Sequence, residues 1–143
     1  MTFVDTNVLV YAVCAGGADR AKAEIAREIL RRDDLAISVQ VLQEFYVQAT
    51  RAGRVQPLSH DEAADLIALW LRFTVVELSV ALMQSALALK RRYQTSYWDA
   101  AILAAAASVG CTALLSEDLN PGQNYSSVRV VNPFQSDEGS GND

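Results

Sequence analysis

The chain has 143 residues, of which 51% are hydrophobic and 20% are charged. This composition is typical of one globular domain and is too apolar for a disordered chain. One His and two widely separated Cys argue against a zinc site built from Cys and His, and no disulfide framework is visible. No apolar run approaches the ~18 residues of a transmembrane helix, and Asp5 stands where a signal peptide would be hydrophobic. We therefore expect a cytoplasmic protein without a membrane segment.

The formal net charge of −5 is unevenly distributed. Three acids lie in the last eight residues, SDEGSGND, and without these residues the chain has 12 basic and 14 acidic side chains. Ten of the 12 basic residues are Arg, whose planar group suits bidentate contact with phosphate. The charge balance therefore neither excludes a nucleic-acid substrate nor supports one.

Short β-like runs alternate with helical runs along the chain. In residues 18–32, Ala26, Ile29 and Leu30 fall on one helical face, opposite a charged face. The first half is expected to contain a strand at Thr2–Asp5, a helix at Thr6–Cys14, a break at Ala15–Gly17, a helix at Ala18–Arg32, a strand at Leu35–Val39 and a helix at Gln40–Ala52.

The second half continues the alternation. Ser59 and Glu62 have the spacing of a capping box, which predicts a helix from Ser59 to about Phe73. The remaining predicted elements are a strand at Val75–Leu78, a helix at Ser79–Tyr93, an Ala-rich helix at Ser96–Val109, a strand at Thr112–Leu115, a loop at Asp118–Gln123 and a strand at Val128–Val131.

Strands separated by helices of this length indicate a parallel sheet covered on both faces. We therefore predict an α/β fold, a three-layer sandwich with a central, mostly parallel sheet flanked by helices, in a single domain over residues 1–135. The acidic tail at 136–143 is expected to be flexible.

Four carboxylates stand at positions where such a sheet binds ligands. Ligands bind at the carboxyl ends of parallel strands, and Asp5 and Asp118 follow the first strand and the TALL strand. Asp99 lies in the first turn of the Ala-rich helix and Glu44 one turn into its own helix, both among apolar residues. Carboxylates in apolar surroundings are seldom buried unless they are paired or bind a metal.

The local sequence offers these acids no cationic partner. Residues 2–17 and 96–116 contain no Lys or Arg. Converging acids without counter-charges repel one another, and a divalent cation relieves that repulsion. Hard oxygen ligands favour Mg²⁺ or Mn²⁺ over zinc.

Four segments in this order resemble the PIN-domain ribonucleases, in particular the VapC-type toxins of type II toxin–antitoxin systems. The segments are FVDTNVLVYA (3–12), VLQEFY (41–46), YWDAAILAAA (97–106) and LLSEDLNPGQ (114–123), followed by VVNPF (130–134). No single segment is specific, but their order and spacing are, and the resemblance covers about residues 1–134. It maps the acidic quartet of the family onto Asp5, Glu44, Asp99 and Asp118, and its polar helper positions onto Thr6, Asn7 and Ser116.

The resemblance implies a Mg²⁺-dependent endoribonuclease, a toxin neutralised by a cognate antitoxin protein, and a homodimer. Metal held by carboxylates would activate a water and clamp the phosphate, without any need for His, Cys or Lys. We assign Asp5 and Asp99 as the main metal ligands; Glu44 and Asp118 complete the ring directly or through water. Apolar residues of the early helices, Val10, Tyr11, Ile29 and Leu30, and of the helix from Asp61 to Phe73 are candidates for the antitoxin groove.

Other residues near these segments have less specific interpretations. Arg51 and Arg54, and the run Lys90, Arg91 and Arg92, are candidates for RNA contact, although the run also suits a solvated helix end. Glu117 competes with Asp118 as the fourth acid. Trp98 is expected to pack against the start of its helix.

Two alternative functions remain open at this point. A strand-end Asp also occurs in phosphatase and phosphoacceptor domains, but these usually have a second carboxylate next to the first and a Lys after a later strand. Here Thr6 and Asn7 follow Asp5, and no Lys follows TALL. The second alternative is a non-catalytic interaction module that keeps the fold, against which the intact quartet argues.

Overall fold

The computed structural model describes residues 1–13 and 17–135. Cys14, most of the predicted break at 15–17 and the predicted flexible tail at 136–143 lie outside the described residues. Within the described part of the chain, no helix has the length and apolar character needed to cross a membrane.

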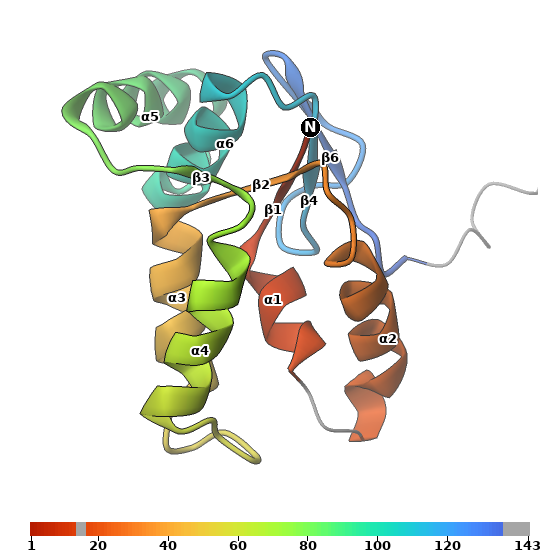
Figure 1. Ribbon diagram of the computed structural model, residues 1–143. Helices are drawn as coiled ribbons and strands as arrows, with labels where there is room; N and C mark the ends of the chain where they lie inside the picture. The colour runs from red at the N-terminus through yellow and green to blue at the C-terminus, as the bar shows by residue number, and fades with distance from the viewer. Residues whose placement is uncertain (14–16, 136–143) are drawn as a thin grey trace, which may run out of the picture.

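A six-stranded sheet in the order β3-β2-β1-β4-β6-β5 forms the centre of the molecule (Figure 1). All neighbouring strands are parallel except β5, which runs antiparallel to β6. The strands are β1 (Thr2–Val4), β2 (Leu35–Ser38), β3 (Thr74–Val76), β4 (Ala113–Leu115), β5 (Asn124–Tyr125) and β6 (Val128–Val131).

Helices flank this sheet, as predicted: α5 and α6 pack against each other on one side, and α1 to α4 gather on the other (Figure 1). The helices are α1 (Thr6–Ala12), α2 (Arg20–Ile29), α3 (Val39–Ala49), α4 (His60–Trp70), α5 (Val80–Tyr93) and α6 (Tyr97–Ser108). This arrangement confirms the predicted α/β fold. Because both faces of the sheet are covered, its central strands are mostly apolar, and all four residues of β2 are buried.

Serine side chains determine where four of the helices begin. Ser38, Ser79 and Ser96 each accept a hydrogen bond from a backbone N–H in the first turn of α3, α5 and α6. Ser59 and Glu62 form the predicted capping box at α4. The predicted strand at Leu35–Val39 is one residue too long, because the cap at Ser38 places Val39 in α3.

Apart from one missed strand, the other differences from the sequence prediction are also at the ends of elements. The helix predicted at Ala18–Arg32 is α2 at Arg20–Ile29, preceded by a 3₁₀ turn at Gly17–Asp19 in which Gly17 has a φ of +77°. That left-handed conformation favours glycine and does not occur inside a regular α-helix, so α2 begins only after Gly17. The two-residue strand β5 was not predicted, because a run this short has no recognisable periodicity.

The Ala-rich helix α6 fixes the position of Asp99. Its residues 100–106 are all buried, and their small side chains allow the helix to lie against β2, β4 and β6. The first turn of α6, which carries Asp99, contacts α3 through a hydrogen bond from Gln40 to the carbonyl of Trp98.

Candidate functional site

The candidate site lies at the carboxyl ends of β1 and β4, the two central strands. Val4 pairs with Leu115 in the parallel register, so the residues that follow both strands emerge at the same edge. Asp5 follows β1 directly and forms the N-cap of α1, and Ser116 follows β4. The predicted meeting of these two segments is therefore a direct result of strand register.

Asp5 is almost completely buried, with 6% of its surface exposed. One carboxylate oxygen accepts a hydrogen bond from the backbone N–H of Thr6 at 2.7 Å, and the other from the hydroxyl of Ser116 at 2.7 Å. Burial, with smaller contributions from the charges of Asp118 and Glu44, nevertheless raises the pKa of Asp5 to about 6. The protein thus holds a carboxylate in a place where its charge is destabilised.

Asn7 links Asp118 to the same network. Its side-chain amide donates to the Ser116 hydroxyl oxygen at 3.3 Å and to the Asp118 carboxylate at 3.2 Å. The backbone N–H of Asp118 also donates to Ser116, at 3.1 Å. The other polar atom of the Asn7 side chain, Oδ1, is buried and has no hydrogen-bond partner among the described residues. An acceptor buried without a donor beside a group of acids is suited to a cation or a water molecule.

Glu44 enters the site from α3 and is held by two donors. The hydroxyl of Thr6 donates to one carboxylate oxygen at 2.6 Å, and the side chain of Gln40 donates to the other at 3.0 Å. Gln40 is itself buried and also donates to the carbonyl of Trp98 at 3.3 Å. The sequence analysis did not select Gln40, although its position four residues before Glu44 places both on one face of α3.

Asp99 completes the group from the first turn of α6. Burial raises its pKa, and the charges of Asp118 and Glu44 add to that effect. The charges of Asp118 and Glu44 thus raise the pKa of both Asp5 and Asp99, so the four predicted carboxylates form one electrostatically coupled group. None of the four takes part in an ion pair within the part of the chain that the structure describes.

The donors of this group are all oxygens, which suits a hard cation such as Mg²⁺. Among residues 1–13 and 17–135, no three Asp, Glu, His or Cys side chains are arranged so that they could hold an ion directly. Mg²⁺ does not need such a set, because it usually retains several waters and binds one or two carboxylates plus substrate phosphates. The acids and the unpaired Asn7 oxygen therefore fit a hydrated Mg²⁺ better than zinc, which is usually bound by three or four protein ligands.

Glu117 lies beside the group but is paired elsewhere. Its carboxylate accepts a hydrogen bond from the hydroxyl of Tyr11 and forms an ion pair with Lys22 at 3.0 Å. Of the two neighbouring acids, Asp118 is therefore the one that joins the network of Asn7 and Ser116. Sequence reasoning missed Lys22, because a pairing across 95 positions leaves no local pattern.

A cleft of about 750 Å³ opens from one end of the acidic group. Asn7 and Asp118 line it at the site, and Arg54 is among its other lining residues; contact of Arg54 with RNA stays a prediction. Arg51 is exposed and is not among the residues that line the cleft.

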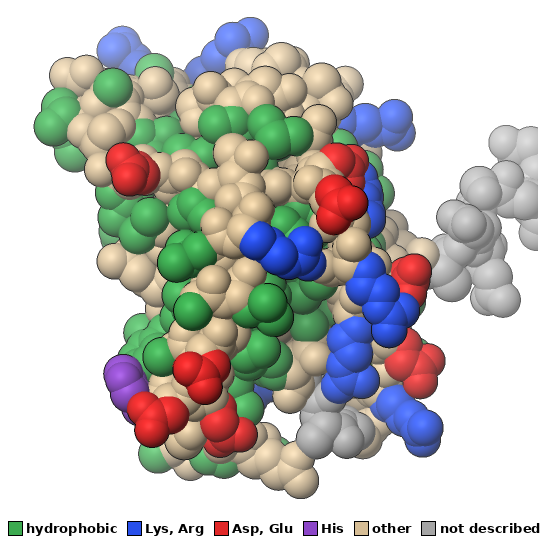
Figure 2. Space-filling model, viewed as in Figure 1, with side chains coloured by type: hydrophobic (Ala, Val, Ile, Leu, Met, Phe, Trp, Pro, Cys, Tyr) green, Lys and Arg blue, Asp and Glu red, His purple; other side chains and the backbone are tan. Residues whose placement is uncertain are grey.

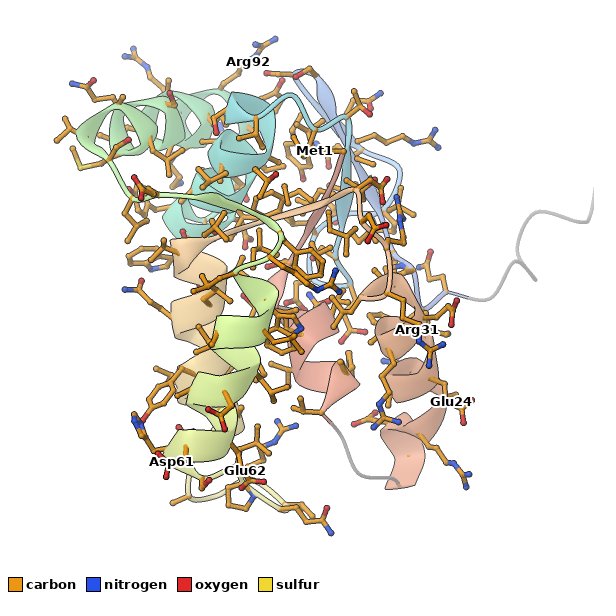
Figure 3. All side chains as sticks on the ribbon, in the orientation of Figure 1. Met1, Glu24, Arg31, Asp61, Glu62 and Arg92 are labelled. Atoms are coloured by element: carbon orange, nitrogen blue, oxygen red, sulfur yellow. The ribbon has the colours of Figure 1, made fainter. Side chains whose placement is uncertain are left out.

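Lys90, Arg91 and Arg92 are not brought to this group. They lie in the last turn of α5, next to Tyr93. The Tyr93 hydroxyl accepts a hydrogen bond from the backbone N–H of Ser126, which lies in the turn leading into β6, at the amino edge of the parallel strands. Figure 3 shows Arg92 at the same end of the molecule as Met1. Contact of these three residues with RNA stays a prediction, and it would require a substrate that reaches the opposite edge of the sheet.

Trp98 differs from its expected packing. Its side chain is 64% exposed, and its described aromatic contact is an edge-to-face one with Tyr97 at 5.1 Å between ring centroids. The other tryptophan, Trp70, is buried against Phe45. Packing of the start of α6 is provided instead by Tyr97, which contacts the hydrophobic core.

Comparisons with known structures find the same fold. VapC20 of Mycobacterium tuberculosis, described as a Sarcin-Ricin loop cleaving toxin, is 21% identical, with a TM-score of 0.65 over 82% of this chain and 92% of that one. A toxin–antitoxin complex from Klebsiella pneumoniae gives 20% identity and a TM-score of 0.67, over 95% and 100%. DNA-bound VapBC of Salmonella typhimurium is 17% identical, with a TM-score of 0.63 over 90% of this chain and 95% of that one. A comparison with curated proteins finds no match.

The family comparison covers most of the chain. The family model described as "PIN domain" matches residues 2–123, which include Asp5, Glu44, Asp99 and Asp118. The fold, its similarity to VapC structures and this match agree with one another, and the chain therefore belongs to the PIN-domain family.

Proposed function

We propose that this protein is a Mg²⁺-dependent endoribonuclease that acts as the toxin of a toxin–antitoxin pair. The observation that carries the proposal is the coupled group of Asp5, Glu44, Asp99 and Asp118, which lies at the ligand-binding edge of the sheet and has no cation paired with it in the described residues. Membership of the PIN-domain family supports the same activity, as does the similarity in fold to the M. tuberculosis toxin that cleaves the Sarcin-Ricin loop.

The carboxylates and the polar residues of the site have different proposed roles. Asp5 and Asp99 are the proposed ligands of Mg²⁺; Glu44 and Asp118 complete its surroundings directly or through water, and one of them orients the attacking water. Thr6, Asn7, Gln40 and Ser116 hold these carboxylates in place through the hydrogen bonds described above. When bound, Mg²⁺ supplies a Lewis acid for the phosphodiester and for the attacking water. Mn²⁺ meets the same requirements.

Cleavage of a structured RNA by the purified chain tests the activity. We expect cleavage with millimolar Mg²⁺, none with a chelator, and none by Asp5→Asn in either condition. Asp65→Asn, which changes an exposed acid of α4 in the same way, is the matched control and should cleave normally. Equal cleavage by Asp5→Asn and the unchanged chain would show that the acidic group is not the active site.

The proposed antitoxin would bind next to this site. Figure 2 shows hydrophobic side chains over α4 and between α4 and α2, with Lys and Arg along α2. Val10 and Tyr11 line the cleft, and Leu69 and Leu71 near the end of α4 are exposed. A partner segment with apolar anchors fits this surface, and an Arg of that segment would neutralise the acidic group. Several structural neighbours are complexes of toxin and antitoxin.

Co-expression tests the antitoxin assignment. The product of the reading frame immediately upstream is expected to copurify with the chain and to suppress its RNA cleavage. Leu69→Glu should weaken copurification, whereas Leu87→Glu, at an exposed leucine of α5, should not. A copurified partner that leaves cleavage unaffected would contradict inhibition at the active site.

A further inference from the structure

Trp98 is the one large aromatic side chain of the described residues that stands mostly exposed, and it lies directly before Asp99. Exposed aromatic side chains next to the acids of a nuclease site offer a flat surface on which an unpaired base stacks. We propose that Trp98 is the stacking platform for one unpaired RNA base next to the phosphate that is cleaved. This inference rests on the proposed ribonuclease function and adds to it a residue that positions the substrate.

The main chain of Trp98 is fixed to the acidic group. Its carbonyl oxygen accepts a hydrogen bond from Gln40, and the same Gln40 amide group donates to Glu44. Ser96 caps the turn that carries Trp98 and Asp99. The backbone that carries the indole is therefore held at a constant place relative to the carboxylates, which a platform for a base adjoining the reacting phosphate requires.

The charges around Trp98 favour stacking over phosphate contact. α3, the helix that contacts this turn, has no Lys, Arg or His, and residues 96–116 have none either. The cations nearest in sequence are Lys90, Arg91 and Arg92 at the end of α5, so few positive charges lie next to this turn to bind phosphates. Aromatic stacking binds a nucleotide without a positive charge, and it requires the base to be unpaired.

The orientation of the ring also suits a base. Tyr97 meets the Trp98 ring edge to face, with an interplanar angle of 76°. The edge-to-face contact supports the indole without stacking on it, so it does not use the ring in the parallel arrangement that a base adopts. Because no hydrogen-bond partner of the indole N–H is shown among the described residues, the platform is expected to accept any base, with preferences set by stacking strength.

The test couples a change in the protein to a change in the RNA. Cleavage of a mixed-sequence, single-stranded RNA oligonucleotide with Mg²⁺ first locates the cleaved bond; abasic nucleotides are then placed on either side of it. Trp98→Ala should lower kcat/KM on intact RNA by about 5- to 100-fold, mainly through KM. At one position, an abasic nucleotide should lower the kcat/KM of wild type by the same factor as Trp98→Ala does. The same abasic nucleotide should not lower the kcat/KM of Trp98→Ala any further.

The controls separate stacking from other roles of Trp98. Trp98→Phe should recover most of the activity, because the smaller ring still stacks. Ile25→Ala, which removes exposed apolar surface from α2, should leave kcat/KM unchanged. The fluorescence of Trp98 should be quenched by intact RNA and not by RNA lacking the coupled base, while buried Trp70 contributes a constant background.

Three results would overturn the inference. If the loss in kcat/KM from Trp98→Ala and the loss from an abasic nucleotide multiply at every position, Trp98 does not touch a base. If duplex RNA of the same sequence is cleaved as well as single-stranded RNA, no unpaired base is needed. If Trp98→Ala turns a dimer into a monomer in sedimentation and its effect does not depend on the base, Trp98 is a contact between copies of the chain. Absence of RNA cleavage by the wild type would instead remove the proposed function, and this inference with it.

Discussion

The carboxyl group of Asp5 shows how the fold balances opposing effects within one residue. Its two hydrogen bonds favour the charged form, whereas burial and the acids beside it favour the neutral form and prevail, which gives a pKa of about 6. A raised pKa means that the native protein binds this proton more tightly than the unfolded chain does. The cost to stability is therefore absent well below pH 4 and fully present above about pH 6.

Asp5→Asn should consequently stabilise the metal-free protein in a pH-dependent manner. With a chelator at pH 7, its free energy of unfolding should exceed that of wild type by about 1–3 kcal/mol, from a shift of roughly two pKa units at about 1.4 kcal/mol each. Near pH 4 the difference should largely disappear, because a protonated Asp and an Asn have similar hydrogen-bonding groups. Urea unfolding at both pH values measures this. A variant less stable at pH 7 would show that the hydrogen bonds of the carboxylate outweigh its desolvation.

Gln40 offers a test of positioning at the same scale. Gln40→Met keeps the approximate size of a buried side chain but removes the donor to Glu44 and to the Trp98 carbonyl. Loss of such a supporting hydrogen bond typically costs about 10- to 100-fold in metal affinity or activity. We expect RNA cleavage that needs more Mg²⁺, with thermal stability close to wild type. Gln43→Met, at an exposed position of the same helix, is the control; similar losses in both variants would contradict a specific role.

The acids of the site could be predicted from the sequence because each stands next to apolar residues, either at the end of a strand or within the first two turns of a helix. Gln40, Lys22 and the exposure of Trp98 could not. Lys22 reaches Glu117 only through the packing of α2 against α1, and Trp98 has the same local sequence whether its ring is buried or exposed. These properties depend on tertiary contacts, which no local pattern reports.

Among the elements, α5 has an unusually apolar exposed face. Val80, Met83 and Leu87 are exposed at a spacing that places them on one side of the helix, and Leu78 lies exposed just before it. Apolar side chains concentrated in this way indicate a protein contact. The homodimer expected from the sequence resemblance has a candidate surface here, distinct from the proposed antitoxin surface over α4.

Met83→Glu should therefore shift the chain toward the monomer. Sedimentation velocity over a range of protein concentrations compares it with wild type and with Gln84→Glu, which adds the same charge at a neighbouring exposed position. We expect wild type and Gln84→Glu to dimerise and Met83→Glu to dimerise less. A wild-type chain that stays monomeric at high concentration would remove the dimer, and equal behaviour of all three would place its interface elsewhere.

Element type proved more predictable than element length. Each predicted helix exists, because burial of an apolar face and, at four helices, a serine cap act within a few residues of sequence. Ends were predicted less well: α3 ends at Ala49 and not at Ala52, and α4 at Trp70 and not near Phe73. Where a helix stops depends on the packing of its last turn, and apolar residues such as Phe73 continue the pattern while lying in the core beyond the helix.

Across the whole molecule, parallel strand order brings distant segments to one edge. Asp5 and Ser116 are 111 positions apart and are joined by a hydrogen bond because β1 and β4 are neighbours in register. The position of β4 next to β1 follows from the crossover of the chain through β2 and β3. The sequence predicted the fold class and a mostly parallel sheet, but not this order of strands. The site is thus a property of the complete sheet, and its stability is linked to that of the whole domain.

The charges of the site and the binding of Mg²⁺ should therefore change the stability of the whole domain. Asp99→Asn removes one of four mutually repelling charges, so with a chelator the variant should be as stable as wild type or more stable by about 1 kcal/mol. Mg²⁺ should reverse this order, because a ligand that binds the native state stabilises it by mass action, by about 1.4 kcal/mol when free Mg²⁺ is roughly tenfold above Kd. The variant, with a weakened site, should gain less and should not cleave RNA.

Thermal unfolding of both proteins, each with a chelator and with millimolar Mg²⁺, measures the two rankings. Asp61→Asn, which removes a negative charge at the exposed start of α4 (Figure 3), controls for the change in net charge and should respond to Mg²⁺ as wild type does. A gain shared equally by wild type and Asp99→Asn would mean that the ion binds outside the acidic group. Asp99→Asn several degrees less stable than wild type in chelator would mean that the carboxylate supports the fold, and the cost assigned to charge repulsion would then be wrong.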